Sequence, residues 1–295
     1  MKAQTWKSRC FVFLAGWILW LIAGCGERAQ SDRAEPGMSS STSISPPVSV
    51  VPPPIQRIEP IQTIEPLPSG VALHLSFDIG TICKKGKQHY VKDLSGNGHY
   101  GFIRNVTPAK GKFGAAVNFT GKSASKVSGP DASLPSGSAP STISLWFSTR
   151  TIYYNFLFTY GTPAANQLRG LAIFQPNTLS FFRWEYDALD VGHLPFTTNE
   201  WHHFVASYDG EKAAIYLDGE KKGEKAFQTK TVLSQYLLGK SYEQRGYFDG
   251  LIDELIVFNR ALSDGEIKAL YNRKEYSELG ELSYESAPQC DQTGS

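Results

Sequence analysis

The chain has 295 residues, of which 41% are hydrophobic and 19% are charged. Its 29 Lys and Arg residues and 28 Asp and Glu residues leave a net charge of +1, so the chain has no basic field to attract nucleic acid. We therefore expect no nucleic-acid partner. Changes in composition along the chain divide it into four regions, taken here in order.

Residues 1–24 have the pattern of an export signal. Lys2, Lys7 and Arg9 precede an apolar run over residues 10–23, which ends in small residues. This order is typical of a secretory signal peptide. The run is short for a membrane-spanning helix, which needs roughly 18–20 apolar residues. We predict that residues 1–24 are a signal peptide.

Residues 22–25, Ile-Ala-Gly-Cys, resemble the bacterial lipobox. The resemblance implies that Cys25 is diacylated and becomes the first residue after cleavage. Several acyl chains hold a protein to a membrane far better than one. Gly26 follows instead of the Asp that retains lipoproteins in the inner membrane, so we expect a lipid anchor in the cell envelope, at the outer membrane. The alternative is an ordinary signal peptide or short anchor in which Cys25 stands by chance.

Residues 25–70 are rich in Ser and then in Pro. Such a segment cannot bury enough apolar surface to offset the entropy of ordering it, and its prolines stiffen it. A repeat of Ile-Gln-x-Ile-Glu-Pro at 55–60 and 61–66 is too short to form a solenoid. We predict a disordered tether that lifts a folded domain off the membrane.

Residues 71–275 form the folded domain and have the two-residue periodicity of β-strands. Asp209-Gly210 and Asp218-Gly219 each lie between alternating runs, as in tight β-hairpins. Many short strands favour a two-sheet antiparallel jelly-roll sandwich, so the fold class is all-β. The predicted strands are 72–77, 115–119, 142–148, 155–160, 170–174, 178–186, 201–208, 212–217, 235–239 and 250–258.

One helix is predicted, near the C-terminal end of the domain. Ser263 and Glu266 have the spacing of a capping box, in which each side chain meets the backbone amide of the other residue. Ile267, Leu270 and Tyr271 then fall on one face. Beyond the domain, residues 276–295 are predicted to be a tail.

Five blocks of the domain, in order, resemble laminin-G-like jelly-roll domains of the concanavalin A-like lectin/glucanase superfamily. The blocks are Leu75-Ser-Phe-Asp78 with Asp93-Leu-Ser-Gly-Asn-Gly98, Gly111-Lys-Phe-Gly-Ala-Ala-Val-Asn-Phe119, Ile143-Ser-Leu-Trp-Phe147, Trp201-His-His-Phe-Val-Ala-Ser-Tyr-Asp-Gly210 and Phe248-Asp-Gly-Leu-Ile-Asp-Glu254. The likeness covers residues 71–275. It implies a concanavalin A-like sandwich and a binding role.

The resemblance bears on the cysteines. If Cys25 carries lipid, Cys83 and Cys290 are the pair left in an oxidising compartment. Terminal strands usually lie side by side in this fold, and a disulfide between these two residues would then join the ends of the domain. The alternatives are two free thiols, or a tail that never reaches Cys83.

Related domains often hold Ca²⁺ with carboxylates from the first and last strands, and the matching residues are Asp78 and Asp253. Calcium takes six to eight oxygens, so backbone carbonyls and water would complete the shell. In the alternative, Asp78 accepts turn amides, and Asp253 or Glu254 pairs with Arg260.

Some relatives are glycoside hydrolases with a Glu-x-Asp-x-x-Glu strand, and the nearest string here is Glu185-Tyr-Asp-Ala-Leu-Asp190. Its last Glu is replaced by Asp190, and the string falls where two strands turn back on each other. His202 and His203 are neighbours on a strand and should face opposite ways. We therefore expect no catalytic residues and no enzyme activity.

Carbohydrate binding needs exposed aromatic rings that stack on sugar faces, with polar groups nearby. Trp146 is out of phase with Ile143, Leu145 and Phe147 and is expected on the outer face of its sheet. We predict a surface-anchored, non-catalytic binding or adhesion module, with carbohydrate as the favoured ligand. The alternatives are a protein-binding or structural envelope domain and, less favoured, a glycoside hydrolase. The candidate ligand-binding residues are Tyr153, Tyr154, Arg183, Trp184, Tyr186 and Tyr242.

Overall fold

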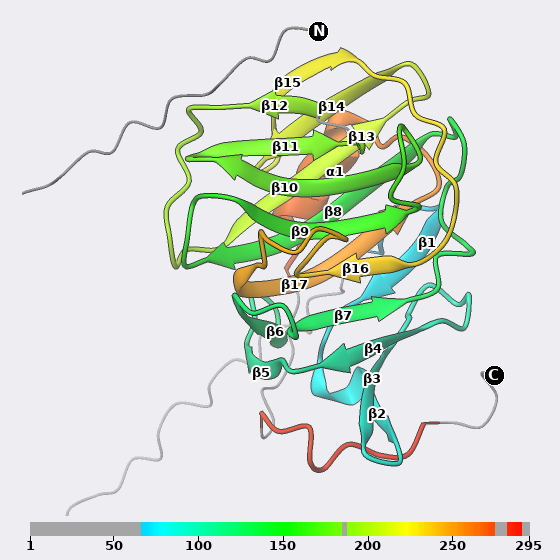
Figure 1. Ribbon diagram of the computed structural model, residues 1–295, viewed down its shortest axis with the longest axis vertical. Coiled ribbons are helices and arrows are strands. Elements are labelled where there is room, and N and C mark those ends of the chain that lie inside the picture. Colours follow the sequence, from blue (N-terminus) through cyan, green and yellow to red (C-terminus); the bar gives the residue numbers. More distant parts are fainter. Residues whose placement is uncertain (1–65, 185–187, 275–281, 291–295) are drawn as a thin grey trace, which may run out of the picture. The chain divides into compact units, whose positions relative to one another are not determined.

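The computed structural model describes residues 66–184, 188–274 and 282–290. Cys25, most of the predicted tether and Tyr186 lie outside these residues. Within them, no helix is both long and apolar enough to cross a membrane. The described chain forms two antiparallel sheets packed face to face with one α-helix, which confirms the predicted fold class (Figure 1).

One sheet has eight strands. Its first strand, β1 (Val71–Leu75), pairs with β17 (Asp249–Phe258) outside the main order of the sheet, and a short 3₁₀-helix, Ile79–Thr81, follows β1. Along the path the strands are β15 (Glu220–Ala226), β14 (Lys212–Leu217), β13 (His202–Tyr208), β8 (Ser141–Thr149), β17 (Asp249–Phe258), β6 (Ala115–Thr120) and β5 (Thr107–Lys110), with β1 (Val71–Leu75) on β17.

The other sheet has nine strands and lies in front in Figure 1. In order they are β12 (Ala188–Val191), β11 (Thr178–Phe182), β10 (Leu168–Gln175), β9 (Asn155–Gly161), β16 (Tyr236–Leu238), β7 (Lys126–Gly129), β4 (Tyr100–Arg104), β3 (Gln88–Lys92) and β2 (Ile82–Lys85). All ten predicted strands are present, although the one expected to reach residue 186 ends at Phe182.

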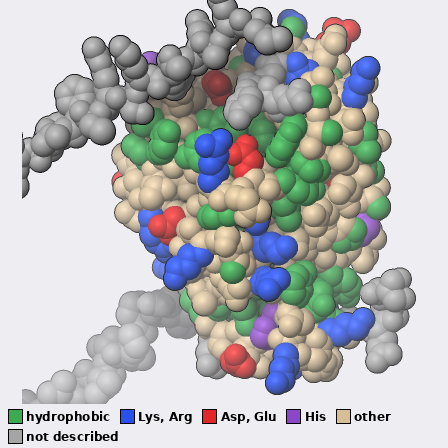
Figure 2. Space-filling view, viewed as in Figure 1, with side chains coloured by type: hydrophobic (Ala, Val, Ile, Leu, Met, Phe, Trp, Pro, Cys, Tyr) green, Lys and Arg blue, Asp and Glu red, His purple; other side chains and the backbone are tan. Residues whose placement is uncertain are grey.

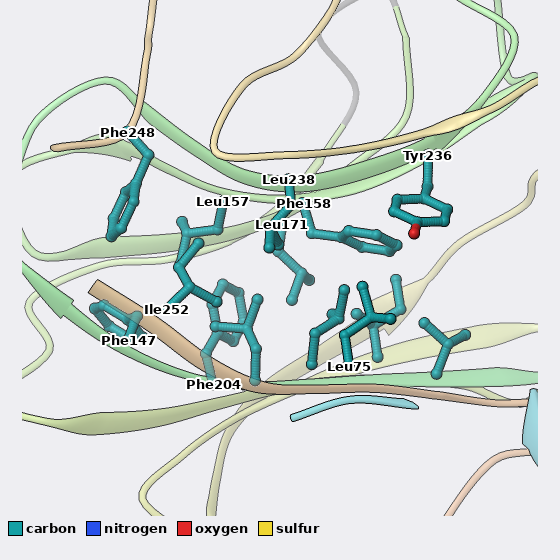
Figure 3. Packing of buried hydrophobic residues seen from close by; sticks show 14 of the residues in the cluster. Leu75, Phe147, Leu157, Phe158, Leu171, Phe204, Tyr236, Leu238, Phe248 and Ile252 are labelled. Atoms are coloured by element: carbon teal, nitrogen blue, oxygen red, sulfur yellow. The ribbon is translucent and has the colours of Figure 1, made fainter. Parts of the chain in front are cut away.

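The core lies between the two sheets (Figure 3). In the nine-stranded sheet, the strand register brings apolar side chains into a continuous inward row. The row is Ile103, Val127, Leu238, Phe158, Leu171, Phe181 and Leu189. Phe147, Phe204 and Ile252 of the eight-stranded sheet face it. Because side chains alternate along a strand, this register fixes which residues remain on the outer faces.

The helix α1 (Asp264–Asn272) covers the outer face of the eight-stranded sheet. Ser263 and Glu266 form the predicted capping box. Ile267 and Leu270 are buried in a cluster with sheet residues such as Val205 and Ile256. Apolar contacts and the cap together hold the helix on this face, so it covers the sheet residues on which it packs.

The C-terminal residues 282–290 pack on the edge of the nine-stranded sheet. Cys290 forms a disulfide with Cys83 on β2, as predicted. The Cys290 amide donates to the Lys84 carbonyl, and the Lys84 amide donates to the Pro288 carbonyl. Tyr284 lies in the hydrophobic core. The disulfide therefore joins residues 207 positions apart and fixes the end of the chain to β2.

Candidate ligand-binding cleft

Strands β9 to β12 carry apolar side chains on both faces. On β10, Leu171 and Ile173 point into the core, whereas Ala172 and Phe174 point outward. The outward side chains form a separate group, which we call the outer aromatic cluster. Its members are Phe156, Leu168, Ala172 and Phe182, with Tyr154, Phe174, Trp184, Ala188 and Tyr242 packed against them.

A cleft of about 580 Å³ opens over this cluster. Its size is that of a typical small-molecule site. Figure 2 looks onto this face of the sandwich and shows hydrophobic side chains gathered there, with charged side chains among them. The lining residues are Tyr153, Tyr154, Phe156, Phe174, Gln175, Thr178, Phe182, Arg183, Trp184, Ala188, Asp190 and Glu243.

The floor of the cleft is built from aromatic rings in contact with one another. Phe156 packs edge-to-face against Phe174 and Phe182, with ring centroids 5.4 Å apart in both pairs, and against Tyr154 at 5.8 Å. Edge-to-face contacts of this kind add about 0.5–1.5 kcal/mol to burial. The floor is therefore held in place without a ligand.

Two aromatic side chains stand at the rim. Tyr153 is 61% exposed, which makes it the most exposed large hydrophobic residue of the described chain. Trp184 is half-buried at the end of β11, against the outer aromatic cluster. A large exposed ring beside a cleft lined with aromatics is typical of a binding surface.

Polar groups sit at the margins of the cleft. Asp190 on β12 accepts a hydrogen bond from the Ser180 hydroxyl at 2.5 Å. Glu243, in the loop after β16, accepts one from the Tyr154 hydroxyl at 3.0 Å. Arg183 donates to the Gln228 carbonyl, and its guanidinium lies 5.4 Å from the Phe227 ring centroid. The cleft combines carbon faces with a few oriented polar groups.

The structure brings together Tyr153, Tyr154, Arg183 and Trp184, four of the six residues proposed as ligand contacts. Tyr242 packs against the same cluster, but its hydroxyl donates to the Gly161 carbonyl at 2.8 Å. Tyr186 lies outside the described residues. Phe174, Phe182, Asp190 and Glu243 also line the cleft and were not predicted as ligand contacts. For Phe174 and Phe182 the signal in the sequence is that outward as well as inward positions of their strands are apolar, whereas Asp190 and Glu243 carry no such signal.

Asp78 and Asp253 approach each other near the outer face of the eight-stranded sheet, with Glu254 beside them. Burial raises the pKa of Asp78, and Glu254 adds to the effect. Burial, with the Glu254 and Asp78 carboxylates, holds the pKa of Asp253 well above its usual range. Ionising these groups in the fold costs stability, so this cluster destabilises the domain as the pH rises from about 4 through their folded-state pKa values.

Main-chain amides already donate hydrogen bonds to the carboxylate oxygens of Asp78 and Asp253. Ala115 donates to Asp78, and Phe113 and Glu254 donate to the two oxygens of Asp253. Among the described residues, no group of three or more His, Cys, Asp and Glu side chains is arranged to hold a metal ion.

The alternative in which Asp253 or Glu254 pairs with Arg260 is wrong. Arg260 instead pairs with Glu266 at 2.5 Å, where it supports the start of α1. Glu254 pairs with His74 at 2.9 Å and lies 3.7 Å from Arg273. These two partners of Glu254 come from β1 and from the end of α1, which the sequence alone does not bring together.

His202 and His203 face opposite sides of their sheet, as predicted. His202 pairs with Asp218 at 2.9 Å and lies near Phe147 on the inner side. His203 stacks on Trp146, which also stacks on Tyr271 of α1. Burial lowers the pKa of His203 to about 3, so it stays neutral near pH 7. The helix thus covers the outward-facing Trp146, which is not a ligand platform.

The described end of the string at 185–190, residues 188–190, lies on β12, which pairs with β11. Phe182 pairs with Ala188, and Asp190 lies opposite Ser180 with its side chain in the cleft. Glu185 and Asp187 lie outside the described residues. The structure therefore places only Asp190 of this string in the cleft.

Solved structures with similar folds include a domain of an arabinanase and two domains described as binding domains. Domain 4 of AbnA, an extracellular arabinanase from Geobacillus stearothermophilus solved with arabinotriose, matches with a TM-score of 0.55 and 22% identity, over 68% of this chain and 98% of that one. The binding domain of Paraclostridial Mosquitocidal Protein 1 matches with a TM-score of 0.53 and 16% identity, over 69% and 52%. The binding domain of botulinum neurotoxin serotype G matches with a TM-score of 0.52 and 13% identity, over 68% of this chain and 50% of that one.

The chain thus spans about half the length of the two toxin domains. Identities this low show a shared fold. None of the curated proteins matches the chain. A family model described as the concanavalin A-like lectin/glucanases superfamily matches residues 120–268, half of the sequence. Together with the two-sheet sandwich, this match shows that the chain belongs to the concanavalin A-like lectin/glucanases family.

Proposed function

We propose that this protein is a non-catalytic carbohydrate-binding module and that the cleft on the nine-stranded sheet is its binding site. The observation that carries the proposal is the open cleft of about 580 Å³, with exposed Tyr153 and half-buried Trp184 at its rim and carboxylates at its margins. Sugar rings present C–H faces that stack on aromatic rings and hydroxyls that donate to carboxylates. The cleft offers both kinds of partner.

The similar domain of the arabinanase was solved with arabinotriose, which supports carbohydrate as the ligand class. Arabinotriose therefore belongs in the first panel of ligands, beside other short neutral oligosaccharides. The alternative is a protein ligand, since two similar structures are toxin binding domains and the floor of the cleft is apolar.

Replacing Trp184 by Ala should weaken carbohydrate binding about 10- to 100-fold. The substitution removes a ring at the rim, and stacking on a side chain of this size contributes on the order of 1–3 kcal/mol. Titration calorimetry of the full-length protein with the oligosaccharides that it binds measures the change. Tyr153→Ala should act in the same direction.

The matched control is Tyr90→Ala. Tyr90 lies on the outer face of the same sheet, but on β3 at the far end from the cleft. It should leave affinity unchanged. Equal losses in Trp184→Ala and Tyr90→Ala would place the binding site elsewhere. If no glycan binds and the cleft variants instead lose capture of one envelope protein, the protein-binding alternative is correct. Release of reducing sugar from β-glucan would contradict the non-catalytic assignment.

We also propose that the protein is lipid-anchored in the cell envelope through Cys25, which rests on the lipobox-like residues 22–25. Cys25→Ser should abolish incorporation of labelled fatty acid and shift the protein from the detergent phase to the aqueous phase. Cys83→Ser, at a cysteine held in the disulfide, is the control and should retain the label. Unchanged labelling of Cys25→Ser would contradict the anchor.

Calcium binding by Asp78 and Asp253 is a further part of the proposal, supported by the position of the two carboxylates beside Glu254, where burial and neighbouring negative charge raise the pKa of each. A cation between them would remove their repulsion. Saturating Ca²⁺ at about 100 times its dissociation constant should stabilise the domain by about 2.7 kcal/mol, or roughly 5–10 °C in melting temperature. Asp253→Asn should abolish this shift. A melting temperature that chelator leaves unchanged would refute calcium binding.

A further inference from the structure

Two carboxylates mark the two sides of the cleft. Asp190 is on β12, at the edge of the nine-stranded sheet. Glu243 is bonded to Tyr154, the residue that precedes β9. β11 and β10 lie between β12 and β9, and strands are about 4.8 Å apart, so the span is about 14 Å. The line from one carboxylate to the other crosses the strands.

Among the described residues, hydrogen-bond donors reach each carboxylate through one oxygen only. Asp190 uses Oδ1 to accept the Ser180 hydroxyl. Glu243 uses Oε2 to accept both the Tyr154 hydroxyl and, at 2.9 Å, the Arg245 Nε–H. From the residues that the structure describes, Oδ2 of Asp190 and Oε1 of Glu243 accept no hydrogen bond. Both oxygens are hydrogen-bond acceptors for a ligand.

Between the carboxylates the cleft offers mainly carbon. Phe174 and Phe182 lie on the floor between β12 and β9, in contact at 5.1 Å between ring centroids. The guanidinium of Arg183 is directed to the Gln228 carbonyl and the Phe227 ring. A ligand crossing the cleft would therefore meet an acceptor, an apolar surface and a second acceptor in turn.

From this arrangement we infer the substrate class of the proposed carbohydrate site: a neutral oligosaccharide that lies across the strands and donates hydroxyls to Asp190 and Glu243. The inference rests on the proposed function. Glu243 is paired with Arg245 at 2.9 Å, but no cationic side chain of the described residues pairs with Asp190, so a uronate carboxylate at the Asp190 end would be repelled, which selects against anionic sugars. A span of about 14 Å requires more than one sugar ring. Asp190 and Glu243 are thus residues that determine specificity.

The test uses four probes with the full-length protein: arabinotriose, cellotriose, xylotriose and trigalacturonate. At least one neutral trisaccharide should bind at least 10-fold more tightly than its own monosaccharide. Trigalacturonate should bind at least 10-fold more weakly than that trisaccharide. Asp190→Asn and Glu243→Gln should each weaken binding of the neutral probe about 10-fold. Each should also reduce the ratio of the protein's affinity for the neutral probe to its affinity for trigalacturonate. Thermal melting checks that both variants are folded.

Glu211→Gln is the charge-matched control, because Glu211 is an exposed residue in the β13–β14 turn of the other sheet. It should change neither affinity nor preference. If a neutral trisaccharide binds but Asp190→Asn and Glu243→Gln leave its affinity intact, this inference is wrong and the proposed function stands. The same holds if trigalacturonate binds as tightly as the neutral probes. If no oligosaccharide binds the native protein, the proposed function fails and the inference falls with it.

Discussion

Removing the Cys83–Cys290 disulfide should lower the free energy of unfolding by about 3–5 kcal/mol. The bond links residues 207 positions apart, so its loss frees nearly the whole domain in the unfolded chain. Loop entropy grows with the logarithm of loop length, which puts this bond at the upper end of the usual range. For a domain of this size the melting temperature should fall by roughly 10 °C.

The disulfide also fixes the C-terminal segment to the domain. Without it, residues 282–290 would still be held by two main-chain hydrogen bonds to Lys84 and by the packing of Tyr284 in the core. We therefore expect the C-terminal segment to become the first site of proteolysis. Cys83→Ala and Cys290→Ala, singly and together, should cost similar amounts, because the covalent link and not either side chain carries the effect. A loss below about 1 kcal/mol in the double variant would contradict this account.

The sequence predicted the sandwich because its long strands alternate or carry dense apolar runs. β8, β13 and β17 are buried along almost their whole length, and all three were found. The strands that were missed are short or polar: β2, β3, β4, β5, β7, β12 and β15. β15, with sequence EKKGEKA, is an edge strand that β14 holds in place through backbone hydrogen bonds. Pairing with a neighbour, not local propensity, makes it a strand.

Only the part of the candidate cleft that has a local signal in the sequence was predictable. The rim aromatics Tyr153, Tyr154 and Trp184 stand out because they lie in or beside turns, where large rings are not needed for the core. Asp190 and Glu243 are 53 positions apart, and neither has a distinctive neighbour in sequence. Only the pairing of β12 with β11, and the hydrogen bond from Tyr154 to Glu243, place them at one site.

Replacing Gly239 by Ala should destabilise the domain by roughly 2–5 kcal/mol. Gly239 has φ +80°, a conformation that costs an L-residue about 1–2 kcal/mol. A Cβ there would lie 2.2 Å from two ring atoms of Phe119, and overpacking a core costs about 1–3 kcal/mol more. Chemical denaturation of the variant measures the total.

Neither side of this contact can move away easily. The Gly239 amide donates to the Leu157 carbonyl at 2.7 Å, and its carbonyl accepts from Phe248 at 2.9 Å, so the backbone is held on both sides. The Phe119 ring is fully buried and packs edge-to-face on Phe248. Relaxation would have to break a hydrogen bond or displace a core ring.

The same residue matters for the cleft, because Gly239 follows β16 directly and begins the loop that carries Tyr242 and Glu243. Strain at this turn should shift Glu243 and weaken carbohydrate binding as well as stability. Gly265→Ala is the matched control: its Cβ would meet no atom within 4 Å, and in helix α1 it should stabilise by about 0.5–1 kcal/mol. Equal effects of the two substitutions would show that Phe119 does not constrain this turn. A loss of stability at Gly239 with unchanged affinity would show that the loop holds Glu243 independently of it.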